Sequence, residues 1–171
     1  MNFTDLETAI SEIKQACDGS ATGGPRFPFF VIAGAGISHP PIPLAKEIET
    51  ECKKTAAGLC RNTPPSGDNP IDTYSHWFNL AYPQPKQRQQ YLRSMIEGKH
   101  ISPANLRLAH LLGVQKVANL VVTPNFDDLL SKALSLFGIP HVVSDHPATV
   151  QRIDPEQLDI CLLYTSPSPR D

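Results

Sequence analysis

Two short apolar runs, each followed by a polar turn and then an amphipathic segment, set the pattern of this chain. The run at residues 27–33 stops at Gly34 and Gly36, and the run at 118–123 stops at a polar turn over 124–128. Runs this short, rich in β-branched and aromatic residues, are typical of strands buried on both faces. We therefore predict two buried strands, each leading through a turn towards a helix.

Elsewhere, apolar residues recur every three or four positions, which predicts amphipathic helices. A helix is expected over 4–17, with Thr4 and Glu7 as its capping box. Another is expected after the second strand, over 129–137, with Gly138 as its stop. The same reasoning predicts helices at about 43–57, 71–83, 91–96, 103–112 and 147–153, and short strands at about 140–143 and 158–163. The aromatic stripe that includes Trp77 and Phe78 is interpreted as packing.

Strands that alternate with helices predict an α/β fold with a parallel sheet and right-handed crossovers. In such sheets, ligands bind beyond the carboxyl ends of the strands. Both polar turns follow the carboxyl end of a predicted strand. We therefore expect the two turns to lie at the same edge of the sheet and to contain the functional site.

Composition narrows the class of protein. The chain has 171 residues, enough for one domain, and its net charge of −2 argues against a general nucleic-acid binder. None of its four cysteines forms a C-x-x-C pair, and Cys17 and Cys52 fall on apolar helix faces as reduced core residues. The acidic N-terminus does not resemble a signal peptide, and no apolar run reaches the ~20 residues of a membrane helix. These features predict a cytoplasmic protein without a membrane segment.

The glycine turn and the polar turn each have a functional and a structural interpretation. Closely spaced glycines let backbone amides approach a phosphate, although the full dinucleotide fingerprint needs a third glycine, and His39 stands in its place. The alternative is a plain turn between a strand and a helix. Similarly, Asn125 could be a helix N-cap, and Asp127 and Asp128 could be first-turn acids that favour the helix dipole.

The two motifs together resemble those of a known family. The segments GAGIS at 34–38 and TPNFDD at 123–128 resemble the Sir2 (sirtuin) superfamily, and most closely the SIR2-like domains of bacterial antiphage defence proteins. The resemblance covers roughly residues 27–160. It implies a Rossmann-like sheet of the DHS-like NAD/FAD-binding type, with helices on both faces. It also implies a small helical insertion at about 60–115, within a domain over 1–160.

The resemblance implies NAD as the ligand and gives each motif residue a role. Asn125 would contact the nicotinamide ribose and help to place the attacking water, and Asp127 would lie beside the nicotinamide end. Breaking the nicotinamide–ribose bond builds positive charge on the sugar, which a carboxylate stabilises. These two residues are therefore the catalytic candidates. The cofactor-binding candidates are Gly34, Ala35, Gly36, Ile37, Ser38, Thr123, Asn125 and Asp127, and no metal site is predicted.

Departures from the family restrict the implied activity. Deacylating sirtuins have an Arg-bearing segment after the first motif, whereas residues 40–44 here read PPIPL. Their catalytic histidine lies in a His-Gly pair that this sequence lacks, and His146 comes one strand too early. The implied function is NAD hydrolysis to nicotinamide and ADP-ribose by an intact parent, with an antiphage role taken from the family alone. The alternatives are a non-catalytic NAD or ADP-ribose sensor, a protein deacylase and a structural scaffold.

The C-terminal segment differs in texture from the rest. Residues 161–171, CLLYTSPSPRD, resemble translated adaptor sequence, so we expect a non-native tail and a native gene that continues past about 160. On this interpretation, the domain is incomplete at its C-terminus. The intact parent could then carry fused domains or form a homo-oligomer.

Overall fold

The computed structural model describes residues 5–21, 27–67, 69–114, 117–144 and 156–163. These residues divide into two compact units. The first contains the described residues up to Gly34 and those from Pro103 onwards, and the second contains Ala35–Ser102. The chain therefore passes from one unit to the other inside the glycine motif.

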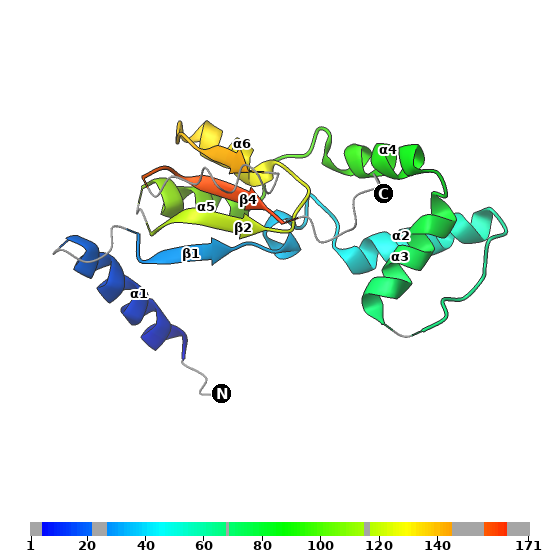
Figure 1. Cartoon of the computed structure of the whole chain (residues 1–171), viewed down its shortest axis with the longest axis horizontal. Coiled ribbons are helices and arrows are strands. Elements are labelled where there is room, and N and C mark those ends of the chain that lie inside the picture. The colour runs from blue at the N-terminus through cyan, green and yellow to red at the C-terminus, as the bar shows by residue number, and fades with distance from the viewer. Residues whose placement is uncertain (1–4, 22–26, 68, 115–116, 145–155, 164–171) are drawn as a thin grey trace. The chain divides into compact units, whose positions relative to one another are not determined.

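A parallel sheet is the centre of the first unit (Figure 1). In the described part of the chain it has 4 strands in the order β1-β2-β4-β3, and every neighbouring pair is parallel. Val121 of β2 is opposite both Val31 of β1 and Ile160 of β4. The parallel sheet confirms the α/β class. The strands are β1 (Phe29–Ile32), β2 (Ala118–Thr123), β3 (Val142–Ser144) and β4 (Asp159–Leu162).

Three helices accompany this sheet among the described residues. They are α1 (Leu6–Ala21), α5 (Pro103–Gly113) and α6 (Leu129–Leu136). α5 and α6 pack against each other and bury apolar residues such as Ala109 and Leu134. After α6, Gly138 has a φ of 67°, a left-handed conformation that favours glycine and ends the helix as predicted.

The prediction that the first strand is buried on both faces is wrong. Phe30 and Ile32 lie on one face of β1 and are 61% and 72% exposed, whereas Val121 of β2 is 0% exposed. Side chains project from the faces of a sheet, so this exposure means that the described chain leaves one face of β1 largely uncovered. β1 is also the edge strand, while β2 has a hydrogen-bonded strand on each side. The apolar residues of α1 are exposed as well, including Leu6 and Ile10.

The start of α1 also differs from the prediction. Asp5 caps this helix, because its Oδ1 accepts the Thr8 backbone N–H at 2.9 Å. The Thr8 hydroxyl also donates to Asp5 Oδ2 at 2.9 Å, and the two hydrogen bonds from Thr8 lower the pKa of the Asp5 carboxyl. Thr4, the predicted cap, lies outside the described residues, so the expected pairing of Thr4 with Glu7 is not described.

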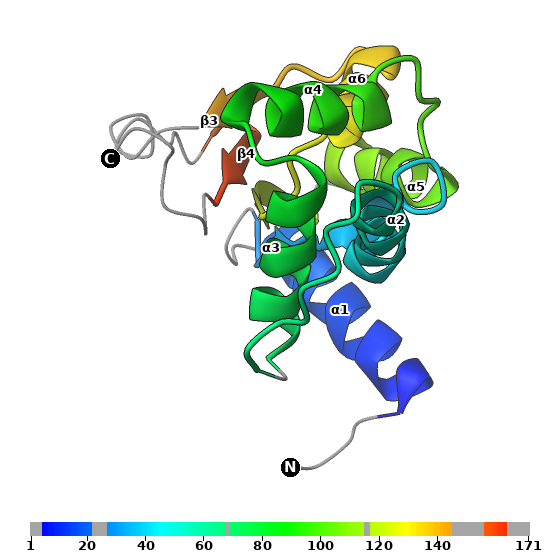
Figure 2. The same ribbon diagram turned by 90° about the vertical axis from the view of Figure 1, so that its right-hand side faces the viewer.

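The second unit is helical (Figure 2). Ile48, Cys52, Ala81 and Met95 form its core, and the neighbouring aromatic side chains pack around them. This packing confirms the interpretation of the aromatic stripe. The elements are the 3₁₀ turn η1 (Ala35–Ser38) and the helices α2 (Ala45–Gly58), α3 (Pro70–Ala81) and α4 (Pro85–Ile96).

Several remaining boundaries differ from those predicted. The helical unit spans Ala35–Ser102, compared with the helical insertion expected at about 60–115. Cys161 and Leu162 pair with Val122 and Thr123 as the end of β4, inside the strand predicted at about 158–163, and the expectation of a non-native tail over 161–171 stays a prediction. The predicted helix at 147–153 and the tail residues 164–171 lie outside the described residues. Within the described ranges, none of the helices is long and apolar enough to cross a membrane.

Candidate functional site

The candidate site lies where β1 and β2 end, in the first unit. Pairing continues one residue past β1, because the Ala33 N–H donates to the Val122 carbonyl at 2.9 Å. Since the two strands are parallel, the segments that leave them emerge at the same edge of the sheet. Gly34 and the turn after Thr123 are therefore neighbours, as predicted from the alternation of strands and helices.

The Thr123 hydroxyl connects the two strand ends. Its Oγ1 donates to the Ala33 carbonyl at 2.7 Å and accepts the Asn125 backbone N–H at 3.1 Å. Thr123 is 5% exposed, so both hydrogen bonds lie largely away from solvent. The sequence suggested Thr123 as a cofactor-binding residue. The sequence could not predict the Ala33 carbonyl as its partner, because every residue type has a backbone carbonyl.

The Asn125 side chain makes the second link between the motifs. Its Nδ2 donates to the Gly34 carbonyl at 3.1 Å. A carbonyl oxygen can only accept, so this bond requires the nitrogen of the amide to face Gly34. The amide oxygen of Asn125 consequently points away from the Gly34 carbonyl. The side chain thus presents an acceptor on the side opposite Gly34.

The acidic residues of the turn have structural roles at the start of α6. Asp127 Oδ1 accepts the Leu129 N–H at 3.1 Å, and Asp128 pairs with Lys132 at 2.8 Å. The N-cap residue of α6 is Asp128, whose side chain makes no capping hydrogen bond, and Asp127 lies one residue before it. Neither aspartate is therefore a first-turn acid of α6, and the side chain of Asn125 bonds to Gly34 instead. The alternative in which Asn125 is the N-cap of this helix is wrong. The hydrogen bond to Leu129 does not exclude a second role for the Asp127 carboxylate.

The glycines of the first motif are not required by the fold around them. Gly34 and Gly36 are exposed, and a Cβ placed on either meets no atom of the described chain within 4 Å. Neither glycine has the positive φ that disfavours other residues. Space and backbone conformation would thus admit alanine at both positions, so a requirement for glycine would have to come from something that binds there.

The structure therefore divides the predicted site residues into two groups. Gly34, Thr123, Asn125 and Asp127 lie in the first unit, where the first three are linked by the hydrogen bonds above. The other four, Ala35, Gly36, Ile37 and Ser38, form η1 in the second unit. There, Ser38 is buried and the Ser102 hydroxyl donates to the Ile37 carbonyl.

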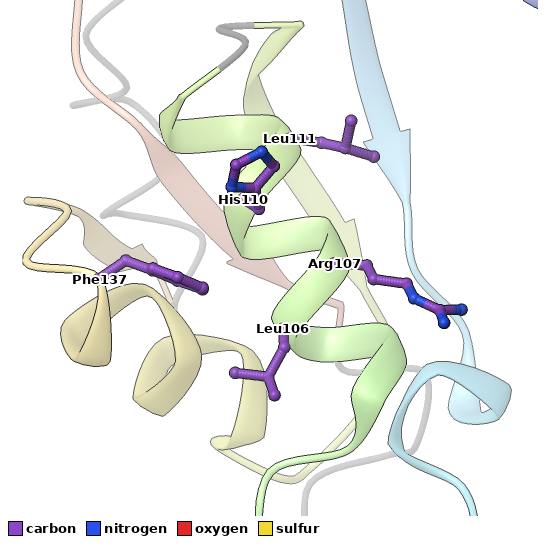
Figure 3. Close-up of a pocket in the computed structure, with 5 residues that line it drawn as sticks. All are labelled: Leu106, Arg107, His110, Leu111 and Phe137. Atoms are coloured by element: carbon purple, nitrogen blue, oxygen red, sulfur yellow. The ribbon is translucent and has the colours of Figure 1, made fainter.

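A separate pocket lies on the outer side of α5 and α6 (Figure 3). It has a volume of about 440 Å³, and the His110 and Phe137 rings that line it form a T-shaped pair with centroids 6.3 Å apart. Figure 3 shows that the side chain of Arg107 points away from the His110–Phe137 side. None of the motif residues lines this pocket, so it is distinct from the strand-end site. Its lining residues are Leu106, Arg107, His110, Leu111 and Phe137.

His141 makes two hydrogen bonds within the first unit. His141 Nδ1 lies 3.0 Å from the Ile139 carbonyl, and its Nε2 lies 2.7 Å from the Ser131 hydroxyl. Because the Ile139 carbonyl only accepts, Nδ1 carries a proton, and in the neutral imidazole Nε2 then accepts from the Ser131 hydroxyl. His146, which we considered as a base, lies outside the described residues. Within the described ranges, no cluster of three or more ligand-type side chains could hold a metal ion.

Comparison of the sequence with protein-family models gives no match. Comparison with curated proteins gives no match either. The functional assignment therefore depends on the residues of the strand-end site and on the motifs that contain them.

Proposed function

We propose that the chain is a SIR2-like NAD-binding domain with a Rossmann-like sheet of the DHS-like type. The observation that carries this proposal is the hydrogen bond from Asn125 Nδ2 to the Gly34 carbonyl. The two motifs that resemble the family are 91 residues apart, and this bond joins them directly. A contact between two turns at the carboxyl edge of parallel strands supports a shared ligand site.

The glycine motif is proposed to bind the diphosphate of NAD. Backbone N–H groups in a glycine-containing turn can approach phosphate oxygens closely because no Cβ intervenes. The exposure of Gly34 and Gly36, and the absence of any described neighbour that would exclude a Cβ, support this role. By the family resemblance, Ala35, Ile37 and Ser38 complete this segment.

The polar turn is proposed to face the nicotinamide ribose. The amide oxygen of Asn125 would accept a hydrogen bond from a ribose hydroxyl or from the attacking water. The Asp127 carboxylate would stabilise the positive charge that develops on the sugar as nicotinamide leaves. In this hydrolysis, a water oxygen would bond to the anomeric carbon as the nicotinamide–ribose bond breaks, with the electron pair of that bond leaving on the nicotinamide nitrogen and a water proton passing to solvent, yielding nicotinamide and ADP-ribose. An antiphage role would then act by consuming NAD.

The second candidate is a module that senses NAD or ADP-ribose without cleaving it. The sequence contains no His-Gly pair, which favours binding over turnover by these 171 residues. A protein deacylase would need that pair and a later zinc module in a longer chain. The hydrolase and the sensor use the same strand-end site. NAD binding therefore tests the site, and nicotinamide release tests the chemistry.

Calorimetric titration of the 171-residue chain with NAD tests the site. We expect saturable binding that Asn125→Ala weakens by about tenfold, the equivalent of one good hydrogen bond. Asn79→Ala is the matched control, because Asn79 is exposed on α3 in the second unit. Absence of NAD binding by the unmodified chain would contradict the proposal. In a nicotinamide-release assay of this chain, or of a longer protein that contains it, unchanged turnover by Asn125→Ala would remove Asn125 from the mechanism.

A further inference from the structure

We infer that Thr123 is a positioning residue, whose buried hydroxyl fixes the orientation of Asn125 and does not itself contact the ligand. The inference rests on the proposed NAD site and specifies how that site is held together. It changes the role of Thr123 from a cofactor-binding residue to a residue that acts through its neighbour.

The Thr123 hydroxyl uses most of its hydrogen-bonding capacity within the protein. A threonine hydroxyl has one proton and two acceptor lone pairs. The proton is committed to the Ala33 carbonyl at 2.7 Å, and one lone pair accepts the Asn125 N–H at 3.1 Å. With the residue only 5% exposed, a ligand at the edge of the sheet has little access to this hydroxyl.

These two hydrogen bonds hold the ends of neighbouring strands together. The Ala33 carbonyl belongs to the end of β1, and the Asn125 N–H belongs to the turn after β2. The hydroxyl therefore ties the backbone of that turn to the neighbouring strand, and the side chain of Asn125 adds its own bond to Gly34. A β-branched residue suits this position, because its second Cβ substituent restricts χ1 and keeps the hydroxyl in place.

The hydrogen bonds made by Thr123 and Asn125 together form a clamp that prepares Asn125 for ligand recognition. With the backbone of Asn125 held by Thr123 and its Nδ2 held by Gly34, rotation of the amide is restricted. Its oxygen is left as a preoriented acceptor, suited to a hydroxyl donor such as that of a sugar. Preorganisation of this kind lowers the entropy cost of binding, so loss of the clamp should weaken the ligand without removing any group that contacts it.

The test compares Thr123→Val, which removes the hydroxyl, with Thr123→Ser, which retains it. Thr73→Val is the matched control, because the Thr73 hydroxyl also donates to a backbone carbonyl, that of Asn69 in the second unit. We expect Thr123→Val to weaken NAD binding by about tenfold, and Thr123→Ser and Thr73→Val to stay within about threefold of the unmodified chain. If Thr123→Val does not fold, Thr123→Ala replaces it.

A second readout does not depend on NAD. The side-chain amide protons of Asn125, assigned by their loss in Asn125→Asp, should exchange slowly in the unmodified chain and in Thr123→Ser. In Thr123→Val they should exchange faster and shift towards the values of a solvent-exposed asparagine. If the unmodified chain binds no NAD, the proposed function fails, and the amide protons still decide the role of Thr123. Unchanged amide protons in a folded Thr123→Val or Thr123→Ala variant would overturn the inference.

Discussion

The side-chain amide of Asn125 donates a hydrogen bond of 3.1 Å to the backbone carbonyl of Gly34, across 91 residues of sequence. The bond joins the turn after β2 to the segment that leaves β1. Because the carbonyl can only accept, it also determines which end of the amide faces Gly34. The orientation of this side chain is therefore a property of the fold, established before any ligand binds.

Asn125→Asp tests this relationship through stability. Aspartate has nearly the same shape, but its carboxylate would place an acceptor against the Gly34 carbonyl. We expect the free energy of unfolding to fall by about 1–3 kcal/mol, measured by urea denaturation at neutral pH. The control, Asn79→Asp on the exposed surface of α3, should change it by less than about 0.5 kcal/mol. Equal stabilities of Asn125→Asp and the unmodified chain would contradict the bond.

Gly34→Ala and Gly36→Ala separate a ligand requirement from a structural one. A Cβ at either position meets no described atom within 4 Å, so we expect unfolding free energies within about 0.5 kcal/mol of the unmodified chain. If the backbone here approaches a diphosphate, calorimetry should show a loss of about tenfold or more in NAD affinity.

Gly138→Ala is the opposite control for these two variants. Its φ of 67° strains an alanine, so we expect a loss of about 1 kcal/mol in stability. The site residues lie elsewhere, and NAD affinity should be unchanged. Full NAD affinity in both Gly34→Ala and Gly36→Ala would argue that the glycine turn binds nothing that requires its lack of a side chain.

The sequence predicted the elements of the fold better than their surroundings. β2 was predicted at its observed bounds, because a short run with β-branched residues that ends at Pro124 favours a strand over a helix. β1 was predicted as a strand but wrongly as fully buried. Its side chains resemble those of β2, and burial depends on which strands and helices lie beside it. Strand order, which places β1 at the edge, is not encoded in local periodicity.

For the candidate site, too, the sequence predicted which residues take part but not what surrounds them. The motifs identified Gly34, Thr123 and Asn125, and strand alternation predicted that the turns would meet. The bonding pattern could not be predicted, since the partner of each side chain is a backbone carbonyl that any residue type could supply. The roles left open for Asp127 and Asp128 likewise depended on where the helix begins, because α6 starts at Leu129 and leaves both aspartates before its first turn.

Gly113→Ala tests a close approach in the first unit. A Cβ on Gly113 would lie 2.0 Å from Ile139 Cδ1 and 2.5 Å from its Cγ1. We expect a loss of about 1–3 kcal/mol in the free energy of unfolding, because the side chain of Ile139 must move or the end of α5 must shift. Gly58→Ala, at the end of α2, is the control, since no described atom lies within 4 Å of its Cβ position.

The clash at Gly113 predicts a non-additive double mutant. Ile139→Ala alone should also destabilise, because it removes a half-buried side chain. When Gly113→Ala and Ile139→Ala are combined, the Cβ added at position 113 occupies space that the shortened side chain has vacated. The combined loss should therefore be smaller than the sum of the single losses by about 0.5 kcal/mol or more. Additive losses would show that the two positions do not touch.

Cys52 predicts how the stability of the helical unit depends on pH. Burial raises the pKa of its thiol from 9.0 to about 11, with a smaller contribution from Glu51. Between these values the folded chain keeps a proton that the unfolded chain has lost. The folded state then binds more protons than the unfolded state, so the free energy of unfolding falls as pH rises. The contribution is fully present below pH 9.0 and is lost towards pH 11.

The measurement is urea unfolding followed by the fluorescence of Trp77, the single tryptophan of the chain, which packs against the Cys52 core. Cys52→Ala should flatten the decline above pH 9.0, apart from a constant offset for the lost side chain, and Cys60→Ala, at an exposed position, should leave it unchanged. Burial also raises the pKa of Tyr74, Tyr82 and Tyr91, so the corresponding Tyr→Phe variants are needed to separate these groups from Cys52. A decline of equal slope in Cys52→Ala and the unmodified chain would assign the pH dependence to groups other than the buried thiol.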